Sequence, residues 1–154
     1  MAAPEIESFR RRLFEEFDRI LKTVEGLDQG AMNWRPPAAA ANSLLVLATH
    51  TLGAAEEHIL HRLCGETIGR SRPAEFAATG SGADLHERAD DVKRRISTAL
   101  DGIDTARLDE ERDTPVGTRQ MRSWLIHAIA HTAEHAGQAE LTRDLYIATK
   151  ASAS

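Results

Sequence analysis

Apolar residues recur at intervals of three or four positions along four separate segments of this chain. The segments run from Ile6 to Leu27, from about residue 43 to 64, from Asp84 to Ile103, and from Thr118 to about Tyr146 or Ile147. This spacing places the apolar side chains on one face of an α-helix. No stretch alternates apolar and polar residues for long enough to indicate a β-strand. The sequence therefore predicts four long helices and no sheet.

The segments between these helices are rich in residues that interrupt helices. Residues 28–42 contain Gly30, Pro36 and Pro37, residues 65–83 contain four glycines and a proline, and a third connection contains Pro115 and Gly117. Helices joined by loops of this length predict an all-α fold, a four-helix bundle with long connecting loops. At least one loop is expected to cross an end of the bundle, where it can cover a site.

Helix starts and the domain limits follow from the same pattern. We expect Asn42 or Ser43 to cap the second helix, Asp84 to open the third through a capping-box arrangement, and Thr118 to cap the fourth. Residues 1–148 are predicted to form a single domain. Residues 149–154 are predicted to be a disordered tail.

Composition and charge exclude several classes of protein. The 154 residues carry a net charge of −5, so no basic surface for nucleic acid or for a membrane is expected. No run of about 18 apolar residues indicates a membrane span, and the charged N-terminal segment does not resemble a signal peptide. Cys64 is the single cysteine, so it forms no internal disulfide, as is usual in a reducing compartment. We therefore expect a cytoplasmic protein.

Three histidines lie four residues apart in the last helical segment, within the stretch HAIAHTAEHAGQ. His127, His131 and His135 share one helical face with apolar neighbours, and adjacent members are about 6 Å apart along the axis. Two imidazoles at this spacing can bind one cation, whereas His127 and His135 are too far apart to do so together. Either His127 with His131 or His131 with His135 is the pair, and a third ligand must come from another helix.

The second helical segment offers that third ligand. His50, Glu57 and His61 fall on one stripe there, on the side opposite the strongest apolar stripe. Because the segment around His50 is apolar almost all round, we expect both of its faces to be covered. The alternative is that these histidines are ordinary core residues held by hydrogen bonds. His58, His61 and His86 are expected at the surface or at the rim of a site.

Two stretches of the chain resemble the DinB/YfiT-like superfamily. Trp34 and Pro36 followed by Ser43, Leu44, Leu47 and His50 resemble the start of that family's second helix, and His131, His135, Gly137 and Gln138 resemble its last helix. The resemblance implies a four-helix bundle that holds a divalent metal ion through His50, His131 and His135, with His127 outside the ligand set. Since family members are commonly homodimers, it also implies a homodimer.

The resemblance leaves several functions open. Zn²⁺, Ni²⁺ and Fe²⁺ all accept imidazole ligands. Such an ion could hold a low-molecular-weight thiol as thiolate, which predicts an S-transferase acting on a small-molecule substrate. It could equally generate a metal-bound hydroxide, which predicts a hydrolase. A non-catalytic metal-binding or structural, stress-associated bundle is the third reading. Glu57, Glu134 and Gln138 are the candidate catalytic residues, and Trp34 and Trp124 are candidate pocket walls.

Overall fold

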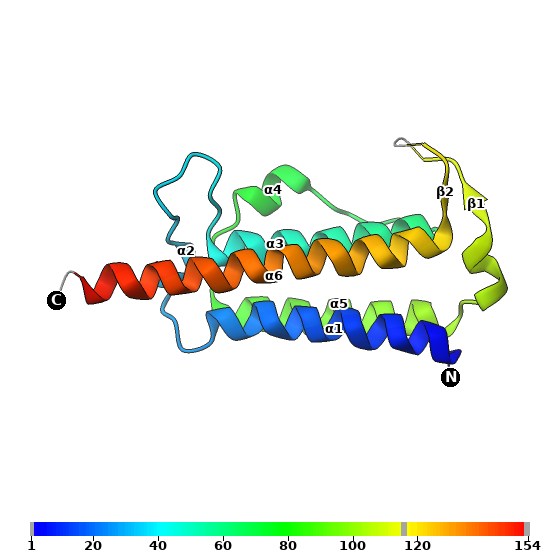
Figure 1. The fold of residues 1–154 in the computed structure, drawn as a ribbon, viewed down its shortest axis with the longest axis horizontal. Coiled ribbons are helices and arrows are strands. Elements are labelled where there is room, and N and C mark those ends of the chain that lie inside the picture. Colours follow the sequence, from blue (N-terminus) through cyan, green and yellow to red (C-terminus); the bar gives the residue numbers. More distant parts are fainter. Residues whose placement is uncertain (1, 115–116, 153–154) are drawn as a thin grey trace.

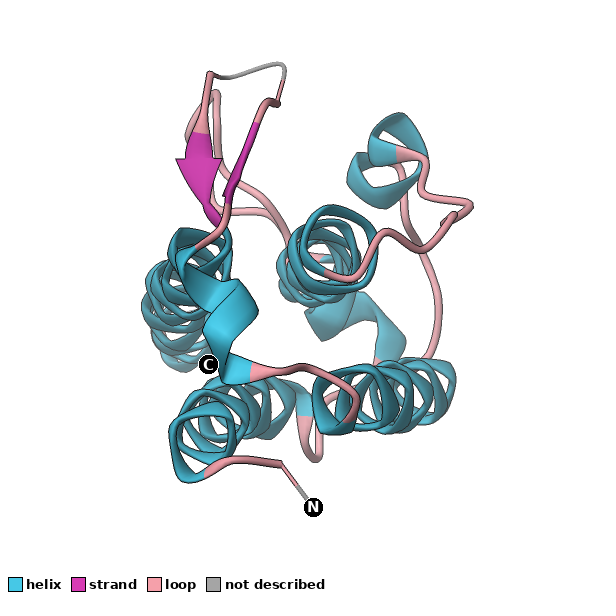
Figure 2. Cartoon of the chain, turned by 90° about the vertical axis from the view of Figure 1, so that its right-hand side faces the viewer, coloured by secondary structure: helices cyan, strands magenta, loops and turns pink. Residues whose placement is uncertain are grey.

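The computed structural model describes residues 2–114 and 117–152, so the predicted turn residue Pro115 lies outside the described residues. Four helical rods run side by side, and they are seen nearly end-on in Figure 2. The rods are α1 (Pro4–Val24), α3 (Leu44–Ala55) continued by η1 (Glu56–Leu63), α5 (Gly82–Asp101) and α6 (Met121–Ala151). In Figure 1, α3 and α6 lie next to each other on one side of the bundle, and α1 and α5 lie on the other. The predicted all-α four-helix bundle with long connecting loops is confirmed.

Side-chain caps explain where two of these rods begin. Ser43 Oγ accepts a hydrogen bond from the backbone N–H of Val46 at 3.2 Å, as predicted for the second helix. The third helix begins two residues earlier than Asp84, because Ser81 Oγ caps it by accepting from the N–H of Asp84. The predicted cap at Thr118 is wrong as well, since the chain is still extended there and α6 begins only at Met121.

The core lies between the four rods and is built from the apolar faces that the periodicity indicated. Every residue of α3 except Thr49 is buried, which confirms that both faces of this segment are covered. The cover comes from this chain itself, because α6, α4, α1 and α5 all pack on α3. The largest fully buried side chains are those of Ile6, Leu13, Phe17, Met32, Leu44, Ile59, Leu60, Leu63, Ile96, Leu100, Leu108 and Met121.

The predicted helix over residues 43–64 has the expected span but changes its winding halfway. Its last eight residues form the π-helix η1, in which each backbone N–H bonds the carbonyl five residues earlier instead of four. The residues after Ala55 are therefore rotated relative to a continuous α-helix. The stripe predicted to contain His50, Glu57 and His61 assumed α-helical winding throughout and is disturbed here.

The connections contain short elements that periodicity did not indicate. They are α2 (Gln29–Asn33), α4 (Arg72–Phe76), the 3₁₀ helix η2 (Thr105–Asp109), and an antiparallel pair of two-residue strands, β1 (Glu111–Arg112) and β2 (Arg119–Gln120). The expectation of no strand is thus wrong at the loop before α6. Helix α6 also runs to Ala151, beyond the expected end at Tyr146 or Ile147, while residues 153–154 of the predicted tail lie outside the described residues.

Among the described residues, no helix combines the length and the apolar character that crossing a membrane requires. The division into a single domain over residues 1–148 stays a prediction.

Candidate metal centre

Three histidines from two helices converge in the seam between α3 and α6. His50 projects from α3, and His131 and His135 project from successive turns of α6. One ring nitrogen of each lies within 4.8 Å of those of the other two. Nitrogens bound to one zinc ion at about 2.0–2.1 Å are themselves about 3.3 Å apart, so small side-chain rotations bring all three rings to a common ion. The triad (His50, His131 and His135) is therefore close enough to bind a metal.

His127 does not belong to this group. It lies one turn before His131 on α6, its ring centroid is 6.0 Å from that of His131, and its side chain is exposed. Within the triad, by contrast, the centroids are 4.4 Å apart for His131 and His135, and 5.2 and 5.1 Å for the contacts of His50 with each of them. Of the two pairs that the spacing left open, His131 with His135 is the one that meets the histidine of α3.

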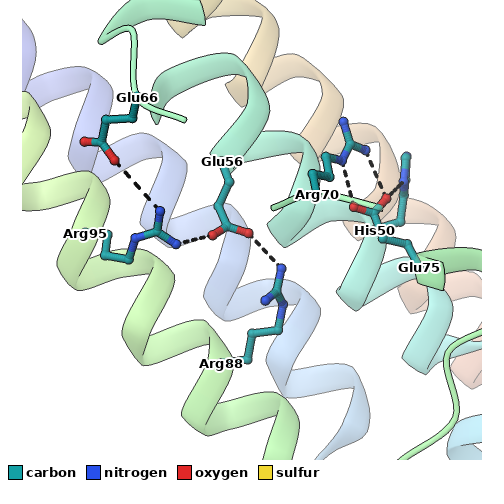
Figure 3. Close-up of polar contacts among 7 residues, drawn as sticks. All are labelled: His50, Glu56, Glu66, Arg70, Glu75, Arg88 and Arg95. Atoms are coloured by element: carbon teal, nitrogen blue, oxygen red, sulfur yellow. Dashed lines mark hydrogen bonds and ion pairs between the residues drawn. The ribbon is translucent and has the colours of Figure 1, made fainter. Parts of the chain in front are cut away.

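A carboxylate that the sequence analysis missed orients His50. Nδ1 of His50 lies 2.9 Å from Oε2 of Glu75 in α4, and Arg70 donates to both oxygens of the same carboxylate at 2.7 and 3.0 Å (Figure 3). Since the carboxylate accepts, Nδ1 carries the proton, and the lone pair of Nε2 is left for an ion. Glu75 thus fixes both the tautomer and the direction of the His50 ring.

A glycine makes room for this carboxylate. A Cβ atom built on Gly53 would lie 2.0 Å from Oε1 of Glu75, which is a severe clash. Any other residue at this position would push Glu75 away from His50, one turn earlier on α3. A glycine in the middle of a helix, where it costs about 1 kcal/mol relative to alanine, was the signal that something approaches this face closely.

Gln138 gives His135 the same kind of support. Nδ1 of His135 lies 2.7 Å from the amide oxygen Oε1 of Gln138, so that here too Nδ1 donates and Nε2 is left for an ion. The other two candidate catalytic residues have different surroundings. Glu57 is held in an ion pair with Arg62 at 2.9 Å. Glu134 is exposed on α6, next to His135 in the sequence.

Burial favours the neutral form of two triad histidines, His50 and His131. Desolvation, together with the nearby histidines and Arg70, lowers the pKa of His131 to about 3. Desolvation also lowers the pKa of His50, although the hydrogen bond with Glu75 opposes this effect. The pKa of Glu75 is lowered, because its bonds with Arg70 and His50 outweigh its own desolvation. Neutral imidazoles beside an ionised carboxylate are the protonation states that a metal ion needs.

A second group of side chains borders the triad on the N-terminal side of α6. His58 of η1 stacks on the ring of Trp124 with centroids 5.5 Å apart, and it meets the edge of His127 at 4.5 Å. His58, expected at the surface or at the rim of a site, is half-buried, and burial lowers its pKa to about 3. Together with Arg62, Arg119 and Ser123 these side chains line a hollow of about 390 Å³, the Trp124 hollow.

The remaining candidate residues have plain structural roles. Trp34 packs against Tyr146 with ring centroids 5.6 Å apart, three turns of α6 beyond His135. Burial raises the pKa of the Cys64 thiol to about 11, so it is a poor nucleophile. Cys64 packs against the hydrophobic core.

The comparisons with known proteins agree with this architecture. A family model described as Mycothiol-S-transferase matches residues 8–147. A crystal structure of a conserved protein from Enterococcus faecalis has a TM-score of 0.75 at 18% identity, covering 96% of this chain and 99% of that one. At this identity the likeness concerns the fold. No curated protein matches the chain. The resemblance to the DinB/YfiT-like superfamily is confirmed, and the chain belongs to the mycothiol S-transferase family.

Proposed function

We propose that this protein is a metal-dependent thiol S-transferase whose cosubstrate is mycothiol or a related low-molecular-weight thiol. His50, His131 and His135 would hold the ion, for which Zn²⁺, Ni²⁺ and Fe²⁺ are the candidates. A divalent ion held there would supply Lewis acidity and would favour the thiolate form of a bound thiol. The sulfur then attacks an electrophilic carbon of a small molecule. An S–C bond forms, and the leaving group departs with the electrons of its bond to carbon.

One observation carries this proposal. Two of the three converging imidazoles bond an oxygen acceptor through Nδ1, Glu75 for His50 and Gln138 for His135. This arrangement is typical of histidines that bind a metal through Nε2, because the outer hydrogen bond fixes the ring. Three ligands on two helices leave coordination positions open for a substrate, as in catalytic rather than structural sites. The family match supports the thiol as cosubstrate.

The side chains around the triad have separate roles in this proposal. Glu75 and Gln138 are positioning residues that act through His50 and His135. Arg70 holds the Glu75 carboxylate ionised and in place. Glu134 is the candidate acceptor for the thiol proton, because its carboxylate is exposed on the helix that carries two of the ligands. Glu57 is committed to Arg62 and is the weaker candidate.

The test measures metal and reaction together. Protein purified without an affinity tag is analysed for bound metal, and is then assayed with several thiols against electrophilic substrates, beside a panel of esters and amides. We expect metal-dependent conjugation with mycothiol. His131→Ala should lose metal and activity, whereas His86→Ala, which changes an exposed histidine on α5, should keep both. Hydrolysis of esters or amides without thiol conjugation would refute the transferase.

The homodimer and the cytoplasmic location remain proposals. The covered second face of α3 no longer supports a dimer, because the chain covers that face itself. Exposed apolar side chains on α6 now provide the support, namely Ile126, Leu141, Leu145 and Ile147. Light scattering on the purified protein would show about twice the mass of one chain if the proposal is right.

A further inference from the structure

We propose that the Trp124 hollow binds the oxygen-rich body of the thiol cosubstrate while its sulfur reaches the triad. This inference rests on the proposed function and names the subsite that the function requires. The hollow has a volume of about 390 Å³, within the range usual for small-molecule sites. It is lined by His58, Arg62, Arg119, Ser123, Trp124 and His127.

The hollow adjoins the triad directly. His58 and His127 line it, and their ring centroids lie 6.1 and 6.0 Å from that of His131. A molecule seated in the hollow therefore needs to extend a short arm past one of these rings to bring a thiol to the triad. The rings of His58 and His127 are thus the side chains between the hollow and His131, since no triad histidine lines the hollow itself.

The wall of the hollow contains polar atoms that have no partner. In the described part of the chain, four buried side-chain nitrogen or oxygen atoms lack a hydrogen bond, and three of them belong to this wall. They are Nδ1 of His58, Nε of Arg62 and Nε1 of Trp124. Trp124 is only 6% exposed. Buried polar groups are almost always paired in proteins, so three unpaired ones on residues that line one hollow favour a bound molecule that these side chains turn toward.

The charge of the hollow is positive. Arg62 from η1 and Arg119 from β2 bring two guanidinium groups to it, and none of its six lining residues carries a carboxylate. Arg62 has Glu57 as a counter-charge outside the lining. Across residues 2–114 and 117–152, Arg119 forms no ion pair, and its recorded bond is to the backbone oxygen of Thr118.

A second hollow, which Glu75 helps to line, contains arginines that are already paired with carboxylates of the chain. Arg70, Arg88 and Arg95 line this hollow of about 480 Å³. Their carboxylate partners are already present, with Glu75 pairing with Arg70, and Glu56 pairing with Arg88 and Arg95 (Figure 3). The guanidinium groups of Arg70, Arg88 and Arg95 thus already have carboxylate partners within the described chain, whereas that of Arg119 has none.

The chemistry of the ligand follows from the donors. Guanidinium and indole N–H groups recognise oxygen acceptors, which are either the hydroxyls of a sugar-like body, as in mycothiol, or the carboxylates of a peptide thiol. Trp124 offers little ring surface for stacking, because it is 6% exposed and already contacts His58 at 5.5 Å and Arg62 at 4.9 Å. We favour hydroxyls because the family match names mycothiol.

The test uses a ligand whose sulfur is blocked, so that binding is measured without the transfer reaction. In a Trp34→Phe background Trp124 is the remaining tryptophan, and its fluorescence reports binding of S-methyl mycothiol, S-methyl glutathione and free inositol. We expect S-methyl mycothiol to change the fluorescence, and Arg119→Ala to raise its Kd about tenfold, as loss of one charged hydrogen bond does. Arg11→Ala, an exposed arginine on α1, is the matched control and should leave Kd unchanged.

Three outcomes are informative. An unchanged Kd in Arg119→Ala overturns the inference, and so does fluorescence that responds to none of the ligands. Tighter binding of S-methyl glutathione supports the hollow as the site but assigns it to carboxylates. Calorimetry on the unaltered chain gives the same comparison if Trp34→Phe does not fold. Binding of a ligand with a blocked sulfur does not depend on the transfer reaction. If such ligands bind but no transfer activity is found, the proposed function is refuted and the assignment of the hollow as a binding site is retained.

Discussion

Two groups of histidines lie next to each other along α6, and they differ in what holds their second nitrogen. In the triad, Nδ1 of His50 bonds Glu75 and Nδ1 of His135 bonds Gln138. In the neighbouring pair, His58 has a buried Nδ1 without a partner, and His127 is exposed. His127, His131 and His135 have identical spacing along the helix. Two of the three triad rings thus carry an outer hydrogen bond that the neighbouring pair lacks, and the spacing along the helix does not reveal this difference.

Removing one histidine from each group is the most direct way to break this comparison. His131→Ala should reduce the affinity for metal by about 100-fold or more, because two remaining ligands hold an ion poorly. His127→Ala should leave the metal content unchanged, since its ring lies outside the triad. Elemental analysis of untagged protein measures both. Equal losses in the two variants would contradict the ligand assignment.

A substitution at Glu75 tests the hydrogen bond that orients the His50 ring and leaves the ring itself in place. Glu75→Gln removes the charge that holds Nδ1–H of His50, and a change of this kind usually costs 10- to 100-fold in metal affinity, about 1.4–2.7 kcal/mol. Glu134→Gln is the matched control, because that exposed carboxylate has no recorded bond to a triad histidine in the described part of the chain. Competition with a chelator gives both affinities. Unchanged binding in Glu75→Gln would show that His50 needs no support.

The neutrality of His131 predicts an acid-sensitive fold in the absence of metal. Above pH 6.5 its ring is neutral in the folded and the unfolded chain, so it contributes no pH dependence. Below pH 6.5 the His131 ring of the unfolded chain binds a proton, whereas that of the folded chain binds one only near pH 3. The free energy of unfolding therefore falls as the pH falls through this window, by about 1–2 kcal/mol for this group at pH 5.

Urea unfolding of chelator-treated protein at pH 7.5 and pH 5 measures this effect. His131→Gln should lose less stability between the two values than the unaltered chain does, because glutamine does not titrate. The difference between the two proteins isolates His131 from the carboxylates that also titrate in acid. A loss of the same size in both would contradict the prediction.

The smallest expected effect concerns the unpaired nitrogen of His58. His58→Phe keeps a planar ring against Trp124 and removes the unpaired Nδ1, which should raise the free energy of unfolding by about 1 kcal/mol. The metal content should not change. His61→Phe should give no such gain, because Nδ1 of His61 already bonds the backbone oxygen of Glu66 at 2.8 Å. A loss of stability in His58→Phe would show that its nitrogen has a partner after all.

The long helices could be predicted because each repeats its apolar residues over five or more turns. The same argument placed His131 and His135 together on α6, and the resemblance to a known family supplied His50 as their companion. Glu75 could not be found in this way. It lies 25 residues from His50 in α4, a five-residue helix too short to show any period, and its role depends on a contact across the fold.

The errors have physical reasons as well. The two-residue strands β1 and β2 are too short for an alternating pattern to indicate them. The predicted stripe of His50, Glu57 and His61 assumed a rotation of 100° per residue, which holds for an α-helix, and η1 is not one. Gly53 was visible in the sequence, but what it makes room for was not.

The change of winding within the second rod has a consequence for how such a protein can vary. Converting Glu56–Leu63 to ordinary α-helical winding would rotate the residues after Ala55 relative to α3, because an α-helix turns 100° per residue and a π-helix turns less. His58 would leave its place against Trp124, while His50, upstream on the same rod, would stay where it is. A change of winding at this joint can thus alter the Trp124 hollow without moving His50.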